Sequence, residues 1–256
     1  MTRGVLLDLA GVIYDGETAI PGGIDAVMRL RQAGLAIRFI SNTTRSSKQS
    51  VLERLQAMGL TVTRADVFTP AHAARDWLLR NGRAPYLLIH PGLAADFCEL
   101  QDRDKRAVIV GDAGDAFTYA ALNDAFRELS AGAELLALAT NRTFRDADGE
   151  LSLDAGPFVA ALEFASLKRA TVLGKPSSEF FLSALASMDC PPDQAIMVGD
   201  DAEADIAGAL SAGLSGALLV RTGKYRHGDE KRFDPRPTAT VADLAAATDW
   251  VLARRD

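Results

Sequence analysis

The sequence predicts an α/β fold, a doubly wound parallel sheet with helices on both faces. Short apolar runs, typical of strands buried on both faces, alternate with amphipathic helical patterns from one end of the chain to the other. No low-complexity linker and no short repeat interrupts this series. With 256 residues, the chain can form one large domain or two modest ones.

The opening part of the chain predicts three strands and three helices in alternation. We expect the strands over residues 4–10, 35–42 and 66–70, and the helices over 22–34, 46–59 and 71–82. The first helix places Ile24, Val27 and Leu30 at helical spacing, and Gly34 and Gly59 supply stop signals for the first two helices.

A second βα series follows, with strands over 85–90, 106–113 and 133–141 and helices over 118–132 and 156–167. Near residue 170 the pattern of the opening part returns. We expect further strands over 170–177, 195–200 and 215–223, helices over 178–189 and after residue 201, and a closing amphipathic helix over 240–255.

Four of the expected strands end in polar side chains. They are Asp8, then Ser41 with Asn42, then Lys175, and finally Asp200 with Asp201. Each has an ordinary alternative role, because an aspartate also suits a helix N-cap, Ser-Asn suits a turn, and a lysine before proline suits the surface. The carboxyl ends of parallel strands meet at one edge of the sheet, where ligands bind. The four together therefore predict one site.

The residue types at this edge suit phosphoryl transfer. Carboxylates and a backbone carbonyl are the hard oxygen ligands that Mg²⁺ prefers. Lys175 would neutralise phosphate charge, and Ser41 and Asn42 would hold phosphoryl oxygens. An aspartate such as Asp8 can act as the nucleophile and form an aspartyl-phosphate. We expect Asp8 and Asp200 as metal ligands; Asp205, one helical turn after Asp201, can orient metal-bound waters or favour the helix N-terminus.

This combination resembles the haloacid dehalogenase superfamily of phosphotransferases across the whole chain. The first motif of that family is matched by Asp8-Leu9-Ala10-Gly11-Val12, the second by Ser41, the third by Lys175 and the fourth by "GDDAEAD" at 199–205. The resemblance implies a Rossmann-like core. The long interval between Ser41 and Lys175 resembles subfamily IIA, in which a large α/β cap is inserted between the second and third motifs. This resemblance implies a catalytic core of residues 1–75 and 172–256, an inserted α/β cap domain over 76–171, and a homodimer through that cap.

Ala10 departs from the family pattern. Most members have there an aspartate that protonates the leaving group and then activates water, which alanine cannot do, although its carbonyl can still bind the metal. Within the superfamily the chain most resembles the branch of phospholysine phosphohistidine inorganic pyrophosphate phosphatases, which has a small residue at this position. The resemblance implies a Mg²⁺-dependent phosphatase for P–N or pyrophosphate bonds, whose substrate is a phosphorylated small molecule or a phospho-amino acid.

Two other functions stay open. One is a phosphomonoesterase for small metabolites, and the other is a weakly active regulatory module that binds a phosphorylated ligand, which Ala10 favours. Halide release is disfavoured, because that chemistry would not use the acidic cluster at 200–205. We expect that Asn141-Arg142-Thr143 either contacts the substrate or forms a turn. The segment "GDAGD" at 111–115 lacks the spacing of a dinucleotide or P-loop motif, so we expect a loop there.

The composition bounds the partners. Hydrophobic residues make up 48% and charged residues 24% of the chain, as in ordinary globular proteins, and the net charge of −6 argues against nucleic acid or an anionic membrane as a partner. No apolar run approaches the roughly 18 residues of a membrane span. Cys98 and Cys190 have no metal-ligand spacing and suit a reducing compartment, so we expect a cytoplasmic protein. We expect structural or surface roles for the three histidines, and a packing role for Tyr14.

Overall fold

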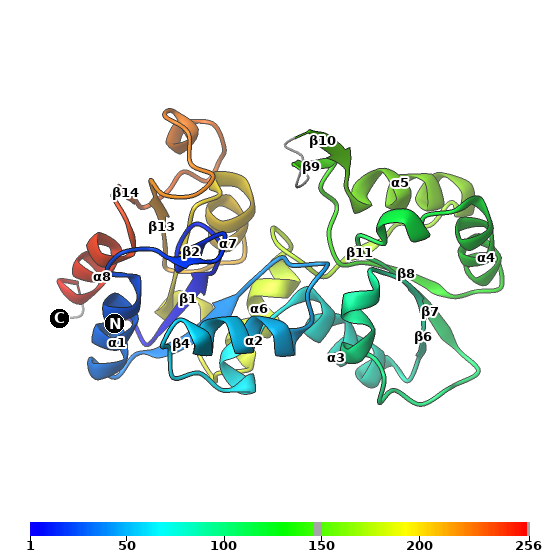
Figure 1. Ribbon diagram of the computed structural model, residues 1–256, viewed down its shortest axis with the longest axis horizontal. Helices are drawn as coiled ribbons and strands as arrows, with labels where there is room; N and C mark the ends of the chain where they lie inside the picture. Colours follow the sequence, from blue (N-terminus) through cyan, green and yellow to red (C-terminus); the bar gives the residue numbers. More distant parts are fainter. Residues whose placement is uncertain (146–149, 255–256) are drawn as a thin grey trace. The chain divides into compact units, whose positions relative to one another are not determined.

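The computed structural model, which describes residues 1–145 and 150–254, divides into two compact units (Figure 1). The first unit comprises Met1–Ser41, Leu52–Phe68 and the chain from Lys175 onward, and the second comprises Asn42–Val51 and Thr69–Gly174. Residues 42–51 and 69–75 therefore group with the second unit. The assignment of a catalytic core to 1–75 and 172–256, and of a cap to 76–171, stays a prediction.

The first unit is built on a six-stranded sheet of strand order β14-β13-β12-β1-β4-β5, in which every neighbouring pair is parallel. The strands are β1 (Gly4–Asp8), β4 (Ala36–Ile40), β5 (Val67–Phe68), β12 (Ala195–Gly199), β13 (Gly216–Val220) and β14 (Ala239–Val241). Every residue of β1, β12 and β13 is buried, which explains their unbroken apolar runs. This arrangement confirms the predicted doubly wound parallel sheet.

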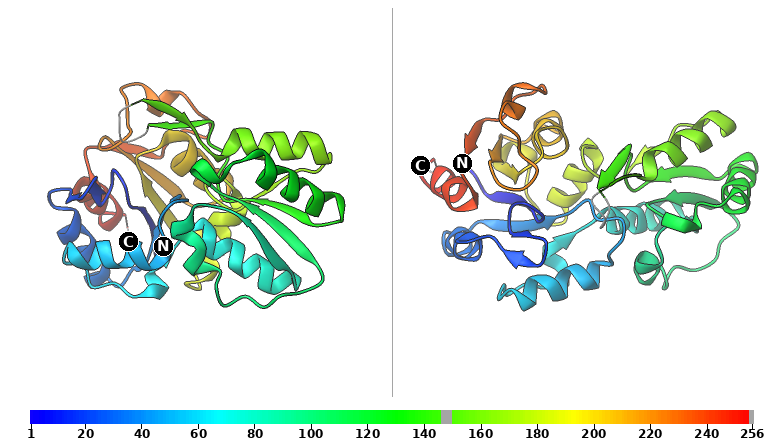
Figure 2. Two further views of the ribbon diagram at one scale, coloured as in Figure 1. Left: turned by 45° about the vertical axis from the view of Figure 1, so that its right-hand side comes forward. Right: turned by 45° about the horizontal axis from the view of Figure 1, so that its top comes forward.

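Helices flank this sheet. The helices α1 (Gly23–Gln32) and α8 (Leu244–Leu252) pack against each other, and α6 (Ser178–Ala186) packs against the short α7 (Gly208–Ser211) and against β4. Figures 1 and 2 show the two pairs on opposite sides of the strands. A small hairpin of β2 (Tyr14–Asp15) and β3 (Thr18–Ala19) follows β1, and it contains Tyr14.

The second unit has its own four-stranded parallel sheet of order β11-β8-β7-β6. Its strands are β6 (Ala84–Leu88), β7 (Arg106–Val110), β8 (Glu134–Ala137) and β11 (Thr171–Val172). The helices α4 (Tyr119–Ser130) and α5 (Ala155–Ser166) pack on β7 and on each other, and they enclose a core of aliphatic side chains such as Val108, Leu129 and Leu162. The helix α3 (Pro70–Asn81) also belongs to this unit, whereas α2 (Lys48–Ala57) begins in the second unit and ends in the first.

Several elements differ from the sequence prediction. The strand expected over 170–177 is reduced to β11, which pairs with β8 of the second unit and not with the core sheet. An antiparallel pair of β9 (Thr143–Arg145) and β10 (Leu151–Leu153) was not predicted, because its strands are three residues each. The strand β14 precedes α8, so the closing helix begins at Leu244 and not at residue 240. None of the helices in the described part of the chain is long and apolar enough to cross a membrane.

Candidate active site

Asp8 and Asp200 follow from two adjacent strands of the core sheet. Asp8 is the last residue of β1 and Asp200 comes directly after β12, which pairs with β1 so that Leu7 lies opposite Val198. Both side chains are buried, with 7% and 2% of the residue exposed. Because the strands are parallel, the two carboxylates leave the same edge of the sheet, as the sequence predicted.

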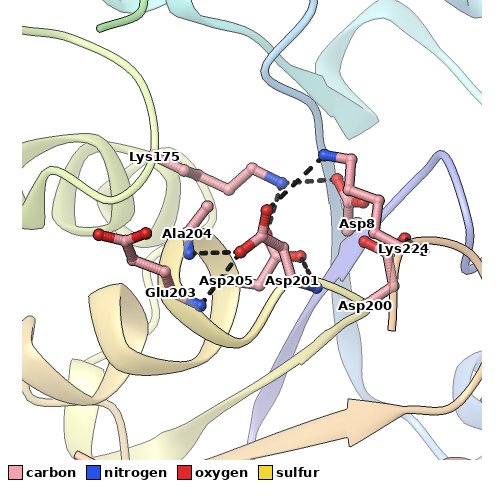
Figure 3. A network of polar contacts seen from close by, with 8 residues as sticks. All are labelled: Asp8, Lys175, Asp200, Asp201, Glu203, Ala204, Asp205 and Lys224. Carbon is pink, nitrogen blue, oxygen red and sulfur yellow. Dashed lines mark hydrogen bonds and ion pairs between the residues drawn. The ribbon is translucent and has the colours of Figure 1, made fainter. Parts of the chain in front are cut away.

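Lys175 reaches the same place from a different element. The sequence predicted that Lys175 ends a core strand, and this is wrong. Lys175 lies three residues after β11, at the start of the last segment of the first unit. Its buried ammonium donates to Asp8 Oδ1 at 2.6 Å and to Asp205 Oδ1 at 2.6 Å (Figure 3). Burial alone would lower the pKa of Lys175, but the charges of Asp205 and Asp8 outweigh it and raise that pKa, so the side chain is cationic.

The acidic motif folds as a π-helix over Ala202–Ala207, in which the Ile206 N–H donates to the carbonyl of Asp201, five residues earlier. Asp201 caps this helix, because its Oδ1 accepts from the backbone N–H groups of Glu203 and Ala204 at 3.0 and 2.9 Å. The cap assigns Asp201 a clear structural role.

Asp205, in the same π-helix, is the partner of Lys175. Its Oδ2 accepts from the backbone N–H of Asp201 at 3.2 Å, while Oδ1 accepts from Lys175. It packs so closely on Gly199 that a Cβ at that glycine would lie 2.3 Å from the Asp205 Cβ. Burial, opposed by the charge of Lys175, raises the pKa of Asp205 to about 7. The sequence offered Asp205 only a water-orienting or helix-dipole role and missed this ion pair.

Asp200 lies between two glycines. Its Oδ2 accepts from the backbone N–H of Lys224 at 2.7 Å, and a Cβ on Gly11 or Gly223 would lie 2.0 or 2.1 Å from that oxygen. Both glycines have positive φ, +80° and +63°, so both positions need glycine for conformation as well as space. Burial, followed by the charge of Asp8, raises the pKa of Asp200 to about 6.

The donor set fits a hard divalent cation. Asp8, Asp200 and Asp205 each offer a carboxylate oxygen, and these oxygens lie within 4.8 Å of one another. Asp200 Oδ1 is buried and has no hydrogen-bond partner among the described residues, which is costly for a carboxylate oxygen unless a cation occupies that side. No described hydrogen bond takes up the carbonyl of Ala10, in the turn after β1. These all-oxygen ligands are those that Mg²⁺ prefers.

The remaining predicted residues divide between the two units. Ser41 directly follows β4, is buried, and donates its backbone N–H to the Phe68 carbonyl. Asn42 is the first residue of the second unit, so its contact with a phosphoryl group stays a prediction. Tyr14 packs in the hairpin with the Arg54 guanidinium over its ring, as expected for a packing role.

The weaker candidates have local roles. Of Asn141-Arg142-Thr143, Thr143 begins β9 and Arg142 lies in a bend just before it, and a contact of this segment with the substrate stays a prediction. The side chain of Asp112 accepts from the Gly114 N–H and pairs with Arg45, which fits a loop at 111–115. His72 lies next to the carboxylate of Asp76, and His90 Nδ1 accepts from the Gly92 N–H.

Two family models match the chain. One, described as haloacid dehalogenase-like hydrolase, matches residues 5–117, and the other, described as HAD-hydrolase-like, matches 172–247. The human haloacid dehalogenase-like hydrolase domain-containing protein 2 is 43% identical over 250 residues, covering 98% of this chain and 96% of the relative. The human phospholysine phosphohistidine inorganic pyrophosphate phosphatase is 40% identical over 260 residues, covering 99% of this chain and 96% of the relative.

Solved structures agree with these matches. A p-nitrophenyl phosphatase from Archaeoglobus fulgidus superposes with a TM-score of 0.88 at 25% identity, covering 97% of this chain and 99% of that one. A glycerol phosphate phosphatase from Mycobacterium tuberculosis, solved in complex with magnesium, has a TM-score of 0.82 at 28% identity, covering 96% of this chain and 76% of that one. The same phosphatase was also solved with calcium. The similarity therefore spans both units.

Proposed function

This chain belongs to the haloacid dehalogenase-like hydrolase family, and from that premise we propose that it is a Mg²⁺-dependent phosphatase that acts through an aspartyl-phosphate on Asp8. The observation that carries the proposal is the buried contact of Lys175 with Asp8, next to an Asp200 oxygen that has no hydrogen-bond partner among the described residues. A nucleophilic carboxylate, a fixed cation and a set of hard oxygen ligands are the groups that phosphoryl transfer needs.

Each residue has a defined part in this reaction. A carboxylate oxygen of Asp8 attacks phosphorus as the P–N or P–O bond to the leaving group breaks, and the leaving group takes its proton from solvent. Water then attacks the phosphorus of the aspartyl-phosphate, which releases phosphate and restores the Asp8 carboxylate. The Lys175 ammonium, held by Asp205, neutralises charge on the transferred group, and Ser41 with Asn42 binds its oxygens. Asp8, Asp200 and the Ala10 carbonyl would hold Mg²⁺, which when bound stabilises phosphoryl charge as a Lewis acid.

Ala10 affects which substrate class the enzyme can hydrolyse. No carboxylate stands at this position to protonate a leaving group, and general acid–base catalysis is typically worth about 10²- to 10⁴-fold in rate. A P–N bond or a diphosphate has a better leaving group than an alkyl phosphate and needs less of this help. We therefore favour phospholysine, phosphohistidine or diphosphate as the substrate class, in line with the name of one relative.

The test is a phosphate-release screen of the purified protein over these substrates, with Mg²⁺ present and with Mg²⁺ removed by a chelator. Wild type should release phosphate only with the metal, and Asp8→Asn should reduce release to background while its circular dichroism spectrum at the assay temperature stays that of a folded protein. Glu203→Gln is the matched control, because Glu203 is exposed and contributes only its backbone N–H to the acidic motif. Activity that survives Asp8→Asn would contradict the proposal.

Two alternatives make different predictions in the same screen. The p-nitrophenyl phosphatase among the similar structures favours a phosphomonoesterase, which would turn over p-nitrophenyl phosphate faster than imidodiphosphate. Ala10 favours a regulatory module, which would bind phosphorylated ligands without releasing phosphate. A homodimer through the cap, a cytoplasmic location and the lack of nucleic-acid or membrane partners stay predictions.

A further inference from the structure

A second lysine borders the acidic cluster, and none of the roles above uses its side chain. Lys224 follows β13 in the segment Thr222–Lys224, which is fixed to the turn after β1: the Thr222 hydroxyl donates to the Gly11 carbonyl, and the Lys224 N–H donates to Asp200 Oδ2 at 2.7 Å. A Cβ on Gly223 would lie 2.5 Å from the Gly11 Cα, so the two loops are in direct contact. The Lys224 backbone is therefore held at the candidate metal site.

The Lys224 side chain is placed quite differently from that of Lys175. Its ammonium lies 3.7 Å from Asp201 Oδ2, and 71% of the side chain is exposed, against 4% for Lys175. Figure 3 shows the two lysines entering the carboxylate cluster from different sides. An exposed lysine side chain is cationic at neutral pH.

The charges of the acidic cluster indicate what the exposed Lys224 ammonium can bind. Four carboxylates (Asp8, Asp200, Asp201 and Asp205) surround two ammonium groups, so a divalent cation would balance the cluster. Lys175 already donates to two carboxylates at 2.6 Å and is buried, so it can serve only the transferred phosphoryl group next to Asp8. The ammonium of Lys224 lies at ion-pair distance from Asp201, beyond hydrogen-bond distance, so its N–H donors can bind an anion at the exposed side of the acidic cluster.

We propose that Lys224 binds the second anionic group of the substrate, the phosphoryl group that is not transferred, and so makes the site selective for diphosphate-like substrates over simple monoesters. This inference rests on the proposed phosphatase function and specifies the substrate class of the same site. A lysine ammonium is a compact charge with three donors that can rotate, so it can bind a phosphoryl group in several orientations. The surrounding loop is ordered by its own contacts, including the Tyr225 hydroxyl on Glu230 at 3.0 Å, so the lysine is presented from a defined position.

Lys224→Met tests the proposal, because it removes the ammonium and keeps the backbone N–H that Asp200 uses. The ratio of kcat/KM on imidodiphosphate to kcat/KM on p-nitrophenyl phosphate should fall about 10-fold, the size of a partly exposed charge-assisted hydrogen bond. Lys224→Arg should keep most of the ratio. Lys231→Met, an exposed lysine of the same loop, is the matched control and should leave the ratio unchanged.

A binding measurement separates this inference from the proposed function. Calorimetric titration with methylenediphosphonate and with methylphosphonate, at one fixed Mg²⁺ concentration, needs no turnover. Lys224→Met should weaken the diphosphonate about 10-fold more than the monophosphonate. Equal weakening of both ligands, or of neither, would overturn the role of Lys224 even if the enzyme is an active phosphatase. Selective weakening in a protein that releases no phosphate would uphold the role and contradict the phosphatase.

Discussion

Replacing Lys175 by methionine tests how the site is held together before any substrate binds. The change removes the ammonium that joins Asp8 and Asp205, both at 2.6 Å, and leaves three carboxylates buried side by side. Breaking a buried ion pair by removing one partner typically costs about 3–5 kcal/mol, because an uncompensated charge is left behind. At 2–4 °C per kcal/mol for a domain of this size, the thermal midpoint should fall by roughly 6–20 °C.

The loss should depend on pH in a defined direction. Burial already raises the pKa of Asp205 to about 7, and without Lys175 the charge that opposes this rise is gone, so the folded pKa climbs further. A carboxyl group with a folded pKa above its unfolded value holds its proton longer in the native state. Stability is then highest below the unfolded pKa and falls as the pH rises toward the folded pKa. Lys175→Met should therefore lose more stability at about pH 8 than at about pH 5.5.

The assay is thermal unfolding followed by circular dichroism at both pH values, with and without Mg²⁺. The metal should recover part of the loss at the higher pH, since a bound cation stabilises the folded state by mass action and neutralises the same carboxylates. Lys231→Met, an exposed lysine far along the chain from Lys175, should change the midpoint by no more than a degree or two. A Lys175→Met midpoint equal to wild type, or an equal loss at both pH values, would refute the reasoning.

Three further predictions concern the same site. Ala10→Asp should raise kcat on an alkyl phosphate such as glycerol phosphate by about 10-fold or more, because it restores acid–base catalysis, on which a poor leaving group depends most; an unchanged or lower kcat would contradict this. Gly11→Ala should abolish the stabilisation by Mg²⁺ in thermal unfolding, because the new Cβ would lie 2.0 Å from Asp200 Oδ2 and the backbone φ of +80° disfavours alanine. A wild-type Mg²⁺ effect would contradict the close packing of Gly11 on Asp200. In wild type, the Mg²⁺-induced midpoint shift should grow from about pH 5 to about pH 8, because protons compete with the metal at Asp200, whose pKa is raised to about 6; a pH-independent shift would contradict Asp200 as a ligand.

The sequence predicted the part of the site that depends on strand order. Asp8 and Asp200 follow unbroken apolar runs, and two such runs that pair in parallel necessarily deliver their next residues to one edge. The same rule failed for Lys175. The apolar pair before it suggested a core strand, whereas β11 pairs with β8 in the other sheet. Local hydrophobicity predicts a strand but does not tell which sheet the strand joins.

The contacts that hold the site were beyond sequence reasoning for a geometric reason. The predicted α-helical spacing after Asp201 places Asp205 one turn on, but the segment is a π-helix, and its side-chain directions differ from those of an α-helix. The closeness of Gly11 and Gly223 depends on packing between loops more than 200 residues apart in the chain. The "TG" after β13 was the available signal, because a glycine at a strand end often marks a close approach of backbone.

The most direct test of the central claim is chemical trapping of the phosphorylated aspartate. The protein is mixed with imidodiphosphate and Mg²⁺, quenched in acid, and reduced with borohydride, which converts an aspartyl-phosphate to homoserine. Peptide mass spectrometry should find homoserine at Asp8, dependent on both substrate and metal, and at no other aspartate of the acidic cluster. Phosphate release without homoserine at Asp8, or with the label on Asp200 or Asp205, would contradict the account.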